Sequence, residues 1–172
     1  PDDHAEACLR GGYWIDAETA NAEAIAGPAV VLVAAGRKVR CARAAAARLR
    51  AEDGVDARVL VVTSFERLWQ SWDAWQRDPS AWEDDGCGHT LDALMADDAL
   101  INAPMIVTVD AVASVAEWMA NALQRLGSLR VLAPRGYSEA GDLDSIDRLH
   151  GMHSDDIVAA ARAELRWRHR QR

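Results

Sequence analysis

Polar residues and a glycine stand where the apolar segments of this chain end: Thr63 and Ser64, Asp110, and Gly136. If those segments are parallel strands, the four residues gather at the carboxyl edge of one sheet, where open α/β sheets bind ligands. Thr, Ser and Asp after a strand are also the ordinary N-caps of the next helix. The pattern therefore predicts either a strand-end ligand site or a set of helix caps, and caps are the more common use.

Two pairs of side chains have the spacing of metal ligands: Cys87 with His89, and His150 with His153. A zinc site needs a third and a fourth ligand, and the sequence places none beside either pair. We therefore expect no metal site and interpret these histidines as surface or capping residues. No serine has the sequence setting of an activated nucleophile, so a hydrolase is not indicated.

Phosphate-binding glycine loops are missing from the sequence. It has no Gly-x-x-x-x-Gly-Lys segment, and only Gly36 follows the first apolar segment where a dinucleotide-binding fold has three glycines. The formal net charge of −8 also disfavours nucleic acids and anionic membranes as partners. One basic run near the carboxyl terminus departs from this balance: Arg162, Arg166, Arg168, Arg170 and Arg172. Such a run could bind an anion, but more often it complements the dipole at a solvated helix end.

The length and composition fit one globular domain. The chain has 172 residues, of which 50% are hydrophobic and 27% are charged. Cys8, Cys41 and Cys87 are widely spaced and odd in number, which indicates no disulfide framework and favours a cytoplasmic location. No apolar stretch has the length of a membrane span, and no signal peptide is apparent. Because the chain begins at Pro1, we expect it to be a trimmed form or a fragment of a longer protein.

Uninterrupted apolar segments predict buried strands at 29–35, 57–63, 105–109 and 129–133. Helices are predicted at 38–53, 112–126 and 142–150, and from Ser154 onward with Ser154 as the N-cap. This alternation predicts an α/β fold for residues 27–172, with three α/β/α layers and a mostly parallel sheet of about five strands. Residues 1–26 are a lead-in segment in which Tyr13 to Ile15 could add an edge strand.

Tryptophan is concentrated between the second and third predicted strands, at Trp69, Trp72, Trp75 and Trp82. The spacing of three places the first three along one helical stripe. Such a stripe is usually part of a core or of a subunit contact. Four large aromatic residues exceed what a small sheet needs to cover itself, so we favour an interface over a ligand cage.

Six segments, in their order and spacing, carry a resemblance to a known family: 6–13, 34–36, 54–57 with 62–68, 109–110, 130–132 with 136–137, and 158–165. The most specific is Val62-Thr63-Ser64-Phe65, a strand closing on Val-Thr-Ser-aromatic before a helix. Together the segments resemble the carboxy-terminal domain of the homodimeric-type pyruvate dehydrogenase decarboxylase component, within the transketolase-like superfamily. Several departures from that family's pattern identify the chain as a divergent relative.

The resemblance implies one part of a thiamine-diphosphate-dependent decarboxylase that transfers a two-carbon acyl unit to a lipoyl or carrier group. In that family thiamine diphosphate and Mg are bound by the other domains, and their Gly-Asp-Gly to Asn motif is missing from this sequence. The expected role is therefore dimerisation and assembly with cofactor-binding domains or subunits, in a homo- or hetero-oligomer. A chain that stands alone would belong to a split system.

A second interpretation is a non-catalytic interaction module or small-ligand-binding module that retains the same fold but has lost the enzymatic role. Both interpretations predict that the chain has no catalytic residues of its own.

Overall fold

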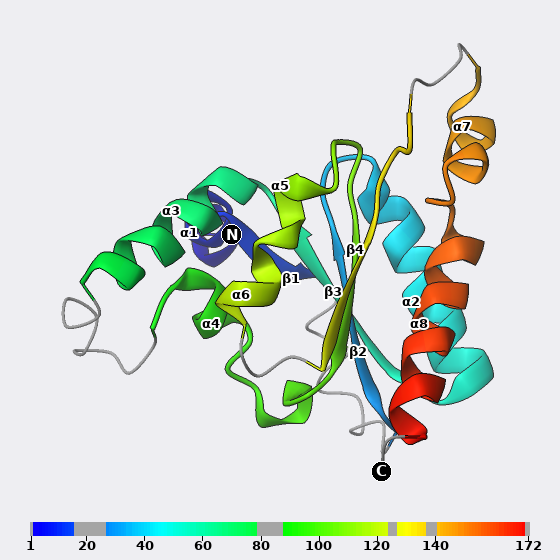
Figure 1. The fold of residues 1–172 in the computed structure, drawn as a ribbon, viewed down its shortest axis with the longest axis horizontal. Coiled ribbons are helices and arrows are strands. Elements are labelled where there is room, and N and C mark those ends of the chain that lie inside the picture. Colours follow the sequence, from blue (N-terminus) through cyan, green and yellow to red (C-terminus); the bar gives the residue numbers. More distant parts are fainter. Residues whose placement is uncertain (1, 16–26, 79–87, 124–126, 137–140, 171–172) are drawn as a thin grey trace.

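The computed structural model of the chain describes residues 2–15, 27–78, 88–123, 127–136 and 141–170. In this part of the chain, helices cover both faces of a central five-stranded sheet (Figure 1). The strands are β1 (Gly12–Ile15), β2 (Ala29–Ala34), β3 (Asp56–Val62), β4 (Pro104–Thr108) and β5 (Ser128–Leu132). The predicted three-layer fold with a mostly parallel sheet is confirmed, and the ends of the four predicted buried strands differ from these bounds by at most one residue.

The strands lie in the order β1-β3-β2-β4-β5. The pairs β3–β2, β2–β4 and β4–β5 are parallel, and β1 runs antiparallel to β3 at one edge. Every residue of β4 is buried, as is β2 from Val30 onward. Continuous apolar sequence is what such strands require, because helices cover both of their faces.

Alternate side chains of β2 enter two separate cores. Val30 and Leu32 pack with α2 (Lys38–Asp53) and α8 (Ser154–His169). Val31 and Val33 pack on the opposite face, towards the helices between β3 and β5. Those helices are α3 (Phe65–Arg77), α4 (Thr90–Leu94), the 3-10 helix η3 (Asp98–Leu100), α5 (Ser114–Glu117) and α6 (Met119–Ala122).

Two further helices are α1 (Asp2–Arg10), which precedes β1, and α7 (Leu143–Leu149), which precedes α8. In Figure 1, α7 stands beyond the end of the sheet at which α2 begins. No helix within the described ranges combines the length and the apolar character needed to cross a bilayer.

The helix predicted at 112–126 is wrong in its extent within 112–123, and 124–126 lie outside the described residues. The structure has two short helices there, and they meet at Trp118. The Trp118 indole N–H donates to the carbonyl of Val115 at 2.8 Å. That carbonyl is the one that the Met119 N–H would use in a continuous α-helix. Competition from the side chain therefore accompanies the break, and Leu123, the C-cap of α6, has a non-helical backbone.

The predicted N-cap of the last helix is wrong by one residue. His153, not Ser154, is the N-cap of α8, and its side chain accepts a hydrogen bond from the helix backbone. The His153 N–H in turn donates to Asp156 Oδ2 at 3.0 Å, which completes a capping box. Gly54 ends α2 in the left-handed region, with φ +62°.

Candidate functional site

A cluster of charged side chains lies at the carboxyl ends of β2 and β4. Gly36, with φ +53°, turns the chain from β2 into α2 and so places Arg37 and Lys38 at this edge. Arg37 Nε donates to Asp110 Oδ2, just after β4, at 2.6 Å, and Arg37 Nη1 lies 2.9 Å from Asp147 Oδ1 on α7. Lys38 Nζ donates to the same Asp147 carboxylate. One arginine thus joins β4 to α7.

Lys38 and Asp147 are withdrawn from water, with 0% and 2% of their side chains exposed. A buried carboxylate needs several donors to offset the loss of its hydration. Asp147 has three, because Cys41 Sγ lies 3.7 Å from its Oδ2 in addition to Lys38 and Arg37. The cluster is therefore internally satisfied, and it fixes α7 against the start of α2.

The electrostatics of the cluster stabilise the charged forms of Asp110 and Arg37 and disfavour a nucleophilic thiolate at Cys41. The hydrogen bond from Arg37 lowers the pKa of Asp110, and the same bond raises the pKa of Arg37. Burial, followed by the nearby Asp147 charge, raises the pKa of the Cys41 thiol. A thiol of raised pKa is a poor nucleophile at neutral pH. Asp110 remains the accessible member of the cluster, with 46% of its side chain exposed.

The other predicted strand-end residues form different local contacts. Ser64 Oγ accepts from the Arg67 N–H at 3.1 Å as the N-cap of α3, so the capping interpretation is confirmed for this residue. Thr63 Oγ1 donates to the Cys8 carbonyl at the end of α1, at 2.7 Å. Asp110 binds Arg37, and the N-cap of α5 is Ala113, so the capping interpretation is wrong for Asp110.

Thr63 and Asp110 follow β3 and β4, which flank β2 on opposite sides. Two inter-strand spacings, roughly 10 Å, therefore separate the ends of their strands. Gly136 follows β5 with φ +153°, and the N–H of Arg135 before it lies 3.4 Å from His150 Nδ1. Among the described residues, Asp110 therefore belongs to the cluster at α2 and α7, whereas Thr63 contacts the end of α1 and Ser64 caps α3.

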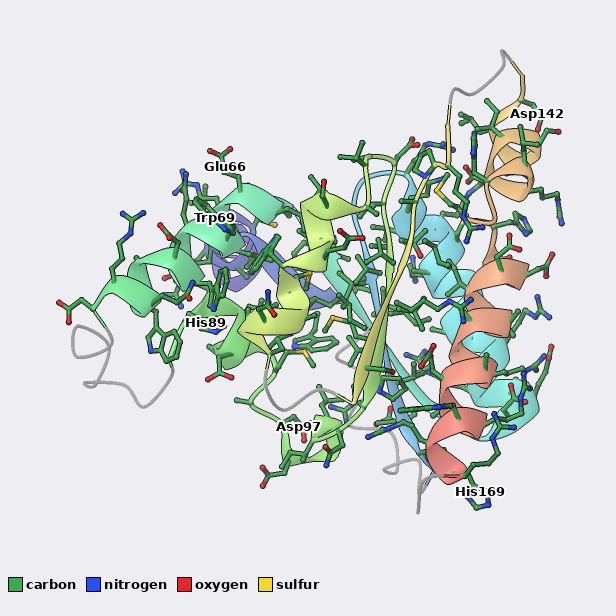
Figure 2. All side chains as sticks on the ribbon, in the orientation of Figure 1. Glu66, Trp69, His89, Asp97, Asp142 and His169 are labelled. Atoms are coloured by element: carbon green, nitrogen blue, oxygen red, sulfur yellow. The ribbon has the colours of Figure 1, made fainter. Side chains whose placement is uncertain are left out.

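Trp72 and Trp75 of the tryptophan stripe are half-buried, and each contacts another ring. The Trp72 ring stacks on Trp118, with centroids 5.6 Å apart and planes inclined by 26°. The rings of Trp75 and His89 are in a T-shaped arrangement, with centroids 5.5 Å apart. Trp69 is the exception, with 41% of its surface exposed on α3 (Figure 2). Trp82 lies outside the described residues.

His89 is a buried cap rather than a metal ligand. Its Nδ1 accepts from the Asp92 N–H as the N-cap of α4, and its Nε2 lies 3.2 Å from the Ala122 carbonyl. Burial lowers the pKa of His89, against smaller opposing effects of Ala122 and Asp92. Its predicted neighbour Cys87 lies outside the described residues. No group of three or more His, Cys, Asp or Glu side chains in the described part of the chain could hold a metal ion.

Sequence reasoning missed the roles of Lys38, Cys41 and Asp147. Asp147 lies on a short helix whose leucines would ordinarily be expected to face the protein. In the structure Leu143 and Leu149 are 55% and 68% exposed, while Asp147 is buried. Because the hydrophobic pattern of α7 is inverted in this way, periodicity could not have identified its buried residue.

Comparison with known proteins gives a consistent result. The model of a family described as "Transketolase-like TK C-terminal domain" matches residues 11–128, which is more than half of the chain. Comparison with curated proteins gives no match.

Solved structures of transketolases share the fold at low identity. A transketolase from Leishmania mexicana is 16% identical, with a TM-score of 0.56 over 92% of this chain and 18% of its own. A transketolase mutant from Pichia stipitis, solved with xylulose 5-phosphate, is 14% identical, with a TM-score of 0.59 over 94% of this chain and 19% of its own. This chain thus spans less than a fifth of either protein.

A third structure is described as a split gene transketolase in the form of an inactive β4 tetramer. It is 18% identical, with a TM-score of 0.50 over 81% of this chain and 40% of its own length.

Proposed function

The chain belongs to the transketolase-like TK C-terminal domain family, and from this premise we propose that it is an assembly domain of a thiamine-diphosphate-dependent enzyme. The whole enzyme would decarboxylate a 2-oxo acid such as pyruvate and transfer the two-carbon acyl unit to a lipoyl or carrier group. The family match over residues 11–128 is the observation that carries the proposal. The choice of a pyruvate dehydrogenase-type enzyme rests on Val62-Thr63-Ser64-Phe65 and the other segments that resemble that family.

The described residues do not fit thiamine diphosphate or its Mg. The chain lacks the Gly-Asp-Gly to Asn motif, and its described part has no cluster of acidic, histidine or cysteine side chains for a metal. The strand-end groups are already bonded internally, as Ser64 is to Arg67 and Asp110 is to Arg37. In this proposal, cofactor-binding domains or subunits hold the coenzyme and supply the carbanion chemistry.

Exposed apolar side chains support an assembly role. Leu9 on α1 is 72% exposed and Trp69 on α3 is 41% exposed. At the carboxyl edge of the sheet, Val112, Leu143 and Leu149 are 55–68% exposed. Large aromatic residues are enriched where subunits meet, so in this proposal Trp69 contacts a neighbouring domain or subunit. The carboxyl edge, with Thr63, Asp110 and Gly136, would face the substrate entrance of the assembled enzyme.

The split transketolase supports a system of separate subunits. A structure described as an inactive tetramer of one split-gene product contains a domain similar to this chain. In our proposal this chain is likewise inactive alone and gains a function only with its cofactor-binding partners. A cytoplasmic location is part of the proposal, since Cys8 and Cys41 are free thiols.

Reconstitution tests the proposal. The chain is mixed with the cofactor-binding domains or subunits of its source organism, thiamine diphosphate and Mg. Release of CO2 from pyruvate and acylation of a lipoyl domain are then measured. A parallel reaction measures ketol transfer from xylulose 5-phosphate. Turnover of pyruvate that requires the chain supports the proposal. Turnover of xylulose 5-phosphate alone supports an assembly role in a thiamine-diphosphate-dependent enzyme but overturns the proposed decarboxylase activity.

The alternative is an interaction or small-ligand module without an enzyme. This alternative is compatible with the exposed ring of Trp69 and with the described inactivity of the similar split-gene tetramer. If both reactions stay at the level of the cofactor-binding subunits alone, although the chain binds those subunits, this alternative replaces the first proposal.

A further inference from the structure

A cavity of about 780 Å³ lies at the edge of the sheet opposite to the charged cluster. Its walls come from Pro28 and Ala29 at the start of β2, Val55 just before β3, and Ala103 just before β4. Ala99 and Ile101 at η3 also line it. The carboxyl-terminal half of α8 forms a further wall, and His169 marks that end of the helix in Figure 2. Pockets for small organic ligands occupy about 300–1,000 Å³, so this one has a suitable size.

The α8 wall of the cavity is basic. Arg162, Arg166 and Arg170 line it at a spacing of four residues, which places all three along one side of the helix. Like charges at this spacing repel one another and destabilise a helix unless counter-charges are near. A basic wall stands out in a chain whose formal net charge is −8.

The arginines of this wall differ in their partners. Arg162 is neutralised by Glu52 at 2.7 Å and by Asp53 at 2.8 Å. The Arg168 guanidinium lies against Gly127, so closely that a Cβ on that glycine would be 2.5 Å from its Cζ. Within the part of the chain that the structure describes, Arg166 and Arg170 form no ion pair with a carboxylate. Two positive charges at the cavity are therefore available to a ligand.

Cations near a helix carboxyl terminus also complement its dipole without any ligand. That effect does not require a cavity, and it does not explain the apolar floor below the arginines, which Val55, Ala103 and Leu165 form. A ligand that uses both features needs an anionic head and an apolar body. The head should carry about two charges to match two guanidinium groups, as a phosphate monoester does near neutral pH.

We propose that this cavity binds a small organic phosphate, with its phosphate held by Arg166 and Arg170 and its body on the floor of Val55, Ala103 and Leu165. The planar guanidinium fork matches two phosphate oxygens at once, which makes arginine well suited to this role. The site is separate from the charged cluster at the carboxyl ends of the strands, and it does not depend on the function proposed above.

Calorimetric titration with phenyl phosphate tests the inference, because this probe combines a dianionic phosphate with a simple apolar ring. Inorganic phosphate and sodium chloride at matched ionic strength are titrated in parallel. We expect phenyl phosphate to bind at least tenfold more tightly than inorganic phosphate and sodium chloride to give no saturable heat. Arg166→Gln and Arg170→Gln should each weaken binding of phenyl phosphate about tenfold, the usual size of one charge-assisted contact.

Arg67→Gln is the matched control, because Arg67 is an exposed helical arginine of α3 in the opposite layer and its loss changes the net charge equally. This variant should bind phenyl phosphate as the parent does. Equal loss of affinity in all three variants would overturn the site, since the effect would then be one of net charge. Absence of saturable binding to the unmodified chain would also overturn it, and equal affinity for phenyl and inorganic phosphate would refute the apolar floor.

Discussion

Lys38 and Asp147 form an ion pair from which water is almost fully excluded, although 109 positions separate them in the chain. The pair connects the first turn of α2 with α7 and therefore fixes the only described helix between β5 and α8. Its consequences for stability can be measured directly.

Asp147→Ala should destabilise the protein by about 3–5 kcal/mol, because Lys38 then remains buried without a counter-charge. Replacing both partners, as Lys38→Met with Asp147→Leu, should recover most of that loss. Chemical denaturation gives the free energy of unfolding of each variant. The control is Asp144→Ala, which breaks an exposed pair with Arg40 and should cost less than about 1 kcal/mol. An Asp147→Ala effect as small as that of the control would contradict the structural role.

Trp72→Ala should lower the free energy of unfolding by roughly 2–4 kcal/mol, because it removes the ring that stacks on Trp118. Trp72→Phe retains an aromatic partner and should lose less than half as much. Trp167→Ala serves as the comparison, since Trp167 is 46% exposed on α8 and its loss should cost less than about 1 kcal/mol. If the losses at Trp72 and Trp167 are equal, the stacked pair contributes no special stability.

Trp69→Ala should leave stability almost unchanged and weaken assembly with partner domains or subunits. Its exposed ring adds little to the core, but a large aromatic residue within an interface can contribute 2 kcal/mol or more, at least about a 30-fold change in affinity. Sedimentation or calorimetry with the cofactor-binding subunits measures the effect. Trp167→Ala, on the opposite helical layer, should assemble normally, and an equal loss in both variants would count against the proposed surface.

Stability should fall with decreasing pH below about 6.5, in part because of His89. Burial lowers the pKa of His89 in the folded protein, so below the ordinary value the unfolded chain binds the proton more readily. Its neutral ring also donates to the Ala122 carbonyl while accepting from the Asp92 N–H, an arrangement that a second ring proton would disrupt. The loss from this one residue should reach at most about 1.4 kcal/mol for each pH unit.

Denaturation midpoints between pH 8 and pH 5 test the role of His89. His89→Gln should flatten the dependence on pH, whatever its effect on absolute stability. His169→Gln, which changes an exposed histidine, is measured alongside as the matched substitution. If the stability of His89→Gln falls with decreasing pH as steeply as that of the parent, His89 is not the cause of the pH dependence.

The sequence by itself determined the sheet. Val30 to Ala34 and Pro104 to Thr108 are buried on both faces, and only uninterrupted apolar residues satisfy that environment. Gly54 likewise marked the end of α2, because a positive φ favours glycine. The hydroxyl of Ser64 was identified as a possible cap, since capping depends on residues three positions apart.

The tertiary structure alone decided which charges meet. Arg37, Asp110 and Asp147 lie far apart in the sequence and converge only when β4 and α7 reach the start of α2. The break at Trp118 and the inverted burial on α7 also arise from contacts that local periodicity does not encode. Local patterns specify elements because those depend on near neighbours, whereas ion pairs and cavities depend on how the finished elements pack.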